Sequence, residues 1–227
     1  MIKKETISSF SGRCFNFTNR FLERYFKLTL VKLGDLAGLI SGNKNMYQTA
    51  LDAETLYWAV EASSKIKGDI AEVGVYRGGS AKMICEAKGN RNLHLFDTFE
   101  GFLNVQDLNS PYVSPGDMSN TSLEEVKDFL KDYDNIYYYK GVFPKTAEPV
   151  KDKRFSLVHI DVDIGPSVTD SLEFFYPRMN EGGIIVMHDY YPKWKEAMEA
   201  ISGFAKDKPE CFVRTTLKQC IMVKIKS

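Results

Sequence analysis

The chain has 227 residues, of which 44% are hydrophobic and 26% are charged, and these proportions are typical of a globular protein with one large domain. Thirty basic residues balance thirty acidic ones, so the sequence predicts neither a nucleic-acid-binding protein nor a polybasic membrane anchor. The four cysteines show no CxxC spacing, and no apolar signal-peptide core follows the first residues. We therefore expect a cytoplasmic protein with reduced thiols that binds neither nucleic acid nor membranes.

The first fifty residues have an irregular helical pattern that differs from the rest of the chain. Within residues 20–32, six apolar side chains share one expected helix face: Phe21, Leu22, Tyr25, Phe26, Leu28 and Leu30. We expect residues 1–52 to form a helical cap or lid that packs on the core, closes over a substrate or forms a homodimer contact. The main domain, residues 53–227, then begins with a helix over residues 53–65.

From residue 69 onward, short β-rich runs alternate with helical stretches. Five strands are predicted, over residues 70–75, 93–96, 136–139, 156–160 and 183–187. The intervening helices are predicted over residues 80–88, 122–131, 168–179 and 193–206, the second of them with a capping box from Ser122 to Glu125. This alternation predicts a Rossmann-like α/β fold, in which a mostly parallel sheet carries helices on both faces.

Two further strands close the chain, over residues 211–215 and 220–225. The few residues between them are too short for a crossover helix, so these two strands should pair antiparallel. The expected sheet therefore has seven strands, one of them antiparallel to the others, which is the outline of a class I methyltransferase. Because one fold supports many activities, this outline alone does not assign a function.

A glycine-containing turn follows the first predicted strand. The strand runs through Glu72 and Gly74 into Tyr76, Arg77 and the loop that ends at residue 80. Glycine lets the backbone bend sharply and approach a ligand, and the next helix offers free N–H groups to a carboxylate. The spacing Gly-x-x-x-Gly is not the GxGxxG pattern of dinucleotide enzymes, and such a turn also occurs as a plain connector.

An acidic residue, Asp97, follows the second predicted strand. Its separation from the glycine loop is typical of a carboxylate that binds ribose hydroxyls, and both lie at neighbouring strand ends of one sheet edge. A nucleoside-containing cofactor is expected to bind there. The alternative is that Asp97 caps a helix or lies in a solvated loop.

A second acidic cluster follows the fourth and fifth strands, where Asp161 and Asp189 end adjacent strands. Two carboxylates at this edge are suited to a divalent cation, which would orient an acceptor hydroxyl and lower its pKa. Strand alternation points Asp163 away from Asp161, so we expect only Asp161 in the site. Three roles are open for His188: a metal ligand, a general base or a packed neighbour. For the strand-end acids Asp161 and Asp189, the alternative to a metal site is that each caps the following helix.

The remaining histidines, His94 and His159, fall inside predicted strands and are interpreted as structural. The run of tyrosines over residues 137–139 is interpreted as sheet packing, and no chemistry is assigned to it.

Three ordered motifs resemble the macrocin O-methyltransferase family. They are Glu-Val-Gly-Val-Tyr-Arg-Gly-Gly-Ser over residues 72–80, Asp-Thr-Phe-Glu-Gly-Phe over residues 97–102, and the block from Asp161 to Tyr190. The resemblance covers approximately residues 70–190. It implies methyl transfer from S-adenosylmethionine to a hydroxyl, often of a sugar or phenol in a natural product, with assistance from magnesium.

The resemblance also implies roles for particular residues. The positions that match the cofactor motifs are Glu72, Gly74, Arg77, Gly78, Ser80 and Asp97. The position that matches the metal-binding and base-forming aspartate is Asp161. Well-known family members carry Asp-Asp-Tyr where this chain has His188-Asp189-Tyr190, and because Mg²⁺ prefers oxygen ligands, this difference favours a softer ion such as Mn²⁺ or an acid–base role for His188.

Two other functions compete with O-methylation. A nicotinamide-dependent oxidoreductase uses a similar sheet, but the first loop lacks GxGxxG. A non-catalytic binding module would keep the cofactor pocket and lose the chemistry, and the change at His188 is compatible with that alternative. A carboxyl or amine acceptor in place of a hydroxyl is also open.

Overall fold

The computed structural model describes residues 38–103, 113–216 and 218–225. The chain divides into two compact units, residues 1–42 and residues 43–227. In the first unit the described residues, 38–42, are helical, and the apolar face expected over residues 20–32 lies outside the described residues. The second unit begins at residue 43, and the domain boundary expected at residue 53 stays a prediction.

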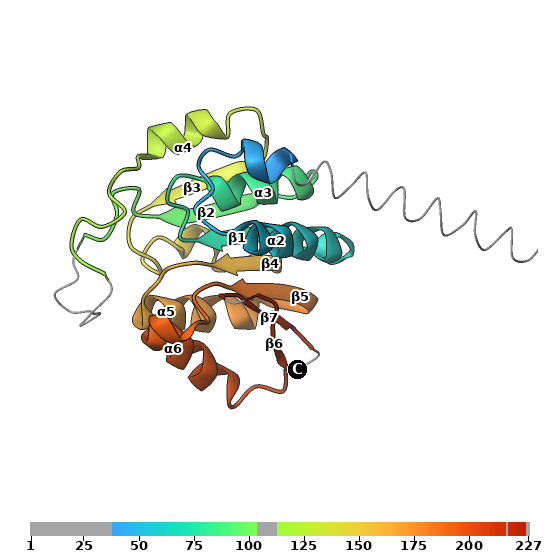
Figure 1. Cartoon of the computed structure of the whole chain (residues 1–227). Coiled ribbons are helices and arrows are strands. Elements are labelled where there is room, and N and C mark those ends of the chain that lie inside the picture. Colours follow the sequence, from blue (N-terminus) through green and yellow to red (C-terminus); the bar gives the residue numbers. More distant parts are fainter. Residues whose placement is uncertain (1–37, 104–112, 217, 226–227) are drawn as a thin grey trace, which may run out of the picture. The chain divides into compact units, whose positions relative to one another are not determined.

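The second unit is built on one sheet of seven strands in the order β3-β2-β1-β4-β5-β7-β6 (Figure 1). The strands are β1 (Asp69–Val73), β2 (Leu93–Asp97), β3 (Ile136–Lys140), β4 (Phe155–Ile160), β5 (Met179–Met187), β6 (Phe212–Arg214) and β7 (Cys220–Val223). Strands β1 to β5 pair parallel, and β7 pairs antiparallel with both β5 and β6. The predicted fold class, with one antiparallel strand, is confirmed.

Helices cover both faces of this sheet. They are α2 (Ala50–Ala62), α3 (Gly79–Ala87), α4 (Leu123–Phe129), α5 (Gly165–Phe175) and α6 (Lys195–Ala205). Short 3-10 helices lie at η1 (Ser63–Lys65), η2 (Glu148–Val150), η3 (Tyr176–Arg178) and η4 (Pro192–Trp194). Side chains of α2, α3 and α4 form one buried core with the strands, and those of α5 and α6 form the other.

Burial and capping explain why these segments adopt their structures. All six residues of β4 are buried, as expected for a central parallel strand covered on both faces. Thr49 and Asp52 form a complete capping box at the start of α2. Ser122 accepts a hydrogen bond from the Glu125 amide at the start of α4, so one half of the predicted box is observed. A cap of this type contributes about 1 kcal/mol to helix stability.

On the face of the sheet that α2 covers, strands β5, β7 and β6 carry apolar side chains that are partly exposed to solvent. Val213 and Val223 lie on this side, and each is about half exposed. An open hollow of about 390 Å³ lies beside them and is lined by Glu54, Thr55, Trp58, Ala59, Ala62, Ile184 and Ile221. None of these residues belongs to the predicted site. Among the described residues, no helix combines the length and the apolar character needed to cross a membrane.

Candidate active site

The glycine loop after β1 is shaped by a close approach to the end of β4. Gly74 has φ +87°, and a Cβ atom added there would lie 1.8 Å from the backbone oxygen of Asp161. Only glycine fits such a position, because it tolerates a positive φ and has no side chain. The contact also places the loop directly beside the second acidic cluster, so the two predicted sites are neighbours.

Asp97, at the end of β2, organises the glycine loop. Its Oδ2 accepts hydrogen bonds from the backbone amides of Val75 (2.7 Å) and Tyr76 (2.9 Å), and its Oδ1 accepts one from Phe99 (2.6 Å). A carboxylate oxygen accepts more than one hydrogen bond, so a ribose contact is compatible with this arrangement. That contact stays a prediction.

The other predicted cofactor residues differ in exposure. Tyr76 donates from its hydroxyl to Asn120 (2.6 Å), Arg77 is exposed, and Ser80 is buried in the first turn of α3. Gly78 is the left-handed residue that precedes α3, with φ 80°. Glu72 is fully buried within β1, where its Oε1 lies 2.8 Å from Nδ1 of His159.

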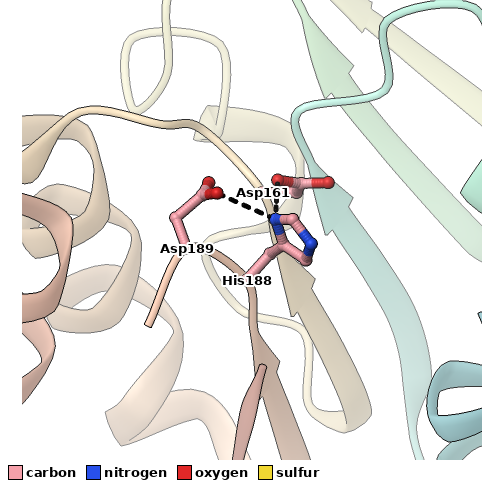
Figure 2. Close-up of side chains that lie close together, drawn as sticks. All are labelled: Asp161, His188 and Asp189. Carbon is pink, nitrogen blue, oxygen red and sulfur yellow. Dashed lines mark hydrogen bonds and ion pairs between the residues drawn. The ribbon is translucent and has the colours of Figure 1, made fainter. Parts of the chain in front are cut away.

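Three residues, Asp161, His188 and Asp189, converge beyond the carboxyl ends of β4 and β5 (Figure 2). One ligand atom from each lies within 4.8 Å of the other two. Nδ1 of His188 lies 3.0 Å from Oδ1 of Asp161 and 3.0 Å from Oδ1 of Asp189, so both carboxylates face the same ring nitrogen. The expected convergence of the two strand ends is therefore observed, whereas the roles of these residues stay predictions.

Charge dominates the chemistry of this cluster. Burial alone would lower the pKa of His188, but Asp161, Asp189 and Asp52 outweigh it and raise the pKa well above its ordinary value. Conversely, burial would raise the pKa of Asp161, but the His188 charge and hydrogen bond hold it below its ordinary value. Burial raises the pKa of Asp189. The cluster thus combines a strongly held imidazole proton with an excess of carboxylates.

Asp163 lies near this cluster but is not one of its three residues. Desolvation, followed by repulsion from Asp189 and Asp161, raises the pKa of Asp163 well above the ordinary value. The expectation that, of Asp161 and Asp163, only Asp161 enters the site stays a prediction, and the three residues that could hold a cation do not include Asp163. Strand alternation does not apply, because β4 ends at Ile160 and the chain turns before it reaches Asp163.

Two residues before and within the first turn of α2 also reach the cluster. The Gln48 amide donates to Oδ2 of Asp161 (2.6 Å), and Oδ2 of Asp52 lies 3.7 Å from Nε2 of His188. The Asp52 side chain is itself held by the Thr216 hydroxyl (2.6 Å). Sequence reasoning missed both Gln48 and Asp52, because they fall within the segment assigned to the cap. The available signal was the Thr-x-x-Asp capping pattern before an apolar helix.

The donor set fits a divalent cation. Two carboxylates and one imidazole lie within 4.8 Å of one another, and Oδ2 of Asp189 is buried with no hydrogen-bond partner among the described residues. Such an atom is stabilised by a cation. A mixed oxygen and nitrogen set suits Mn²⁺ at least as well as Mg²⁺. A cation on Nδ1 of His188 would replace the proton held there.

A sheet of this strand order, with a glycine loop after β1 and an acidic cluster after β4 and β5, defines a Rossmann-like fold of the class I methyltransferase type. The family described as macrocin-O-methyltransferase (TylF) matches residues 42–211. The chain belongs to this family, as the motifs of the sequence indicate.

Two relatives found by sequence similarity are named as O-methyltransferases of natural products. The chain is 28% identical over 154 residues to the 8-demethyl-8-(2,3-dimethoxy-alpha-L-rhamnosyl)-tetracenomycin-C 4'-O-methyltransferase of Streptomyces olivaceus. The aligned region covers 60% of this chain and 59% of the relative. It is also 28% identical over 151 residues to the mycinamicin III 3''-O-methyltransferase of Micromonospora griseorubida, with 59% of each chain covered. The match thus spans about three fifths of each relative.

Solved structures with the same fold include O-methyltransferases. The O-methyltransferase NovP superposes with a TM-score of 0.65 at 20% identity, covering 78% of this chain and 81% of that chain. The O-methyltransferase from Bacillus cereus, in complex with S-adenosylhomocysteine (SAH), superposes with a TM-score of 0.57 at 10% identity, covering 85% and 90%. At these identities the likeness establishes the fold alone.

Proposed function

We propose that the chain transfers a methyl group from S-adenosylmethionine to a hydroxyl of a sugar or other natural-product small molecule, assisted by a divalent cation, Mg²⁺ or Mn²⁺. The observation that carries the proposal is the position of the acidic cluster directly against the glycine loop, where Gly74 meets Asp161. Family membership and the named activities of the relatives support the choice of reaction.

S-adenosylmethionine supplies an activated methyl group, so the protein's main tasks are to align the acceptor and to remove its proton. We assign its methionine end to residues 74–80, where the start of α3 offers free backbone N–H groups. Within this segment the contacts belong to Gly74, Tyr76, Arg77, Gly78 and Ser80, with Glu72 behind them in β1. Asp97 is assigned to the ribose.

Asp161 and Asp189 would hold the cation, with His188 as a third donor, and the bound cation would lower the pKa of an acceptor hydroxyl. Asp161 or His188 receives the hydroxyl proton, the acceptor oxygen forms a bond to the methyl carbon, and the sulfur–carbon bond breaks to release SAH. Asp161 is favoured, because it is the most exposed of the three side chains, whereas Nδ1 of His188 would be bound to the cation.

The first test separates this proposal from an oxidoreductase. Isothermal titration calorimetry should detect binding of SAH to the protein and no binding of NAD. The second test uses S-adenosylmethionine with a labelled methyl group and a panel of glycosylated natural products, with chelator and after addition of Mg²⁺ or Mn²⁺. Methyl transfer that stops with chelator and returns with metal supports the full proposal. Cofactor binding without transfer to any hydroxyl, carboxyl or amine acceptor would favour a binding module.

The same proposal includes three further points. The protein acts in the cytoplasm, it binds a small-molecule acceptor and neither nucleic acid nor a membrane, and it forms a homodimer. The balanced charge of the sequence supports the choice of acceptor. Analytical ultracentrifugation of the full chain tests the homodimer.

A further inference from the structure

A continuous chain of side chains connects the interior of β1 to the acidic cluster. Oε1 of Glu72 lies 2.8 Å from Nδ1 of His159, and Nε2 of His159 lies 3.3 Å from the Gln48 amide nitrogen. The same amide nitrogen lies 2.6 Å from Oδ2 of Asp161. Glu72 and His159 are fully buried, so no water competes for the contact between them.

The direction of every hydrogen bond in this chain follows from the Asp161 carboxylate. A carboxylate only accepts, so Gln48 must present its NH₂ group to Asp161, and the reversed amide would place two oxygens in contact. The second N–H of the same group then faces His159, whose Nε2 must accept. The proton of the His159 ring therefore lies on Nδ1, which donates to Glu72. One tautomer of His159 satisfies all three contacts.

Stability alone does not account for this arrangement. Oε1 of Gln48 and Oε2 of Glu72 are buried with no hydrogen-bond partner among the described residues. Buried acceptors without partners are unfavourable, and apolar side chains of similar size would avoid them. The arrangement is explained if its purpose is the orientation of Asp161, whose other oxygen faces His188 (3.0 Å).

We propose that Glu72, His159 and Gln48 form a positioning relay that orients the Asp161 carboxylate toward His188 and the bound cation. Glu72 sets the tautomer of His159, His159 orients the Gln48 amide, and Gln48 holds Oδ2 of Asp161. The relay rests on the proposed function, because it gives Asp161 the orientation that the cation site requires. It assigns Glu72 and His159 a role through Asp161, beyond packing or cofactor contact.

The test compares Gln48→Leu with a matched control at the opposite edge of the sheet. Gln48→Leu removes the amide donor and keeps the volume. Asn92→Leu removes the same kind of bond, from an amide to the Asp69 carboxylate (3.0 Å), before the amino end of β2. Asp69 contacts Nε2 of His94 (2.8 Å), so each variant disturbs a different histidine.

The readout is the imidazole ¹⁵N spectrum of the metal-free protein, which contains only three histidines. In the unsubstituted protein, the relay requires the Nδ1–H tautomer of His159, and an Nε2–H tautomer would overturn the proposal without any variant. Gln48→Leu should shift Nε2 of His159 and Nδ1 of His188 and spare His94. Asn92→Leu should do the reverse. Unchanged signals of both site histidines in folded Gln48→Leu would also overturn the relay.

Two additions keep the test decisive. If Gln48→Leu does not fold, Gln48→Met keeps the length of the side chain and has no N–H donor, so it should shift Nε2 of His159 and Nδ1 of His188 in the same way; unchanged signals of both histidines contradict the relay. Binding of Mn²⁺, measured by calorimetry, should weaken about 10-fold in Gln48→Leu and stay unchanged in Asn92→Leu, as expected for the loss of a residue that orients a metal ligand. Equal Mn²⁺ affinity in Gln48→Leu counts against the relay.

The failure of the proposed function gives a different result. If the unsubstituted protein binds no Mn²⁺, the cation part of that proposal is wrong, and the tautomer spectrum still decides whether the relay exists.

Discussion

Replacement of Asp97 by asparagine tests how the protein holds its cofactor. Asp97 accepts three backbone hydrogen bonds, two from the glycine loop at Val75 and Tyr76 and one from Phe99. Hydrogen bonds to a charged group contribute about 1.5–3 kcal/mol each, and leaving a buried donor without a partner costs a similar amount. Asp97 is only half-buried, so water replaces part of the loss. We expect Asp97→Asn to lower the free energy of unfolding by about 2 kcal/mol.

The cofactor measurement separates loop organisation from ribose binding. SAH and its 2'-deoxyribose analogue are titrated by calorimetry into the unsubstituted protein and into Asp97→Asn. If Asp97 binds a ribose hydroxyl, the unsubstituted protein should prefer SAH by about 10-fold, equivalent to 1.4 kcal/mol, and Asp97→Asn should lose most of this preference. If both proteins discriminate equally, Asp97 organises the loop and does not bind the ribose.

Three further predictions concern the cluster, the N-terminal unit and acid stability. Asp161→Asn should nearly abolish methyl transfer and leave SAH affinity within about threefold, because the assigned cofactor contacts lie in β1, in the loop and first turn of α3 that follow it, and at the end of β2; an active variant contradicts the proposed chemistry. Deletion of residues 1–42 should spare SAH binding and impair dimerisation or acceptor methylation, as measured by ultracentrifugation and the labelled-methyl assay, and no change in either would refute a lid or subunit contact. Burial lowers the pKa of His94 below 6.5, so the unfolded state binds the proton first and the free energy of unfolding should fall as pH drops through 6.5. His94→Phe should flatten that dependence in denaturant titrations, and an unchanged slope would contradict it.

Much of the fold was predictable from local patterns. Short apolar runs that alternate with segments of helical periodicity predict the succession of strands and helices along the chain. The short connection before β7 predicts its antiparallel pairing. The site acids were also predictable, because parallel strands bring their carboxyl ends to one edge. Asp97 is the last residue of β2, and Asp161 and Asp189 follow the ends of β4 and β5.

The contacts made from α2 were not predictable in the same way. Gln48 and Asp52 are ordinary polar residues near a helix start, and only the tertiary packing of α2 directs them toward Asp161 and His188. His159 shows the reverse case, since its place inside β4 correctly indicated burial but did not reveal its contact with Gln48. Periodicity assigns a residue to a face of an element, and it does not identify the partner across that face.

Asp163 offers a way to measure the cost of the cluster to stability. Asp163 adopts a left-handed backbone, with φ 61°, and its carboxyl group is close to Asp189 and Asp161. A non-glycine residue in this conformation costs about 1 kcal/mol, and repulsion between the carboxyl groups adds to it. Asp163→Asn should remove the repulsion alone, whereas Asp163→Gly should also relieve the backbone and raise the free energy of unfolding by about 1 kcal/mol. Both variants should bind Mn²⁺ more weakly, because a bound cation would favour the ionised carboxylate of Asp163, which both variants lack. Greater stability with weaker Mn²⁺ binding would indicate that this strand end is shaped for a cation at the expense of stability, and lower stability in both variants would refute that view.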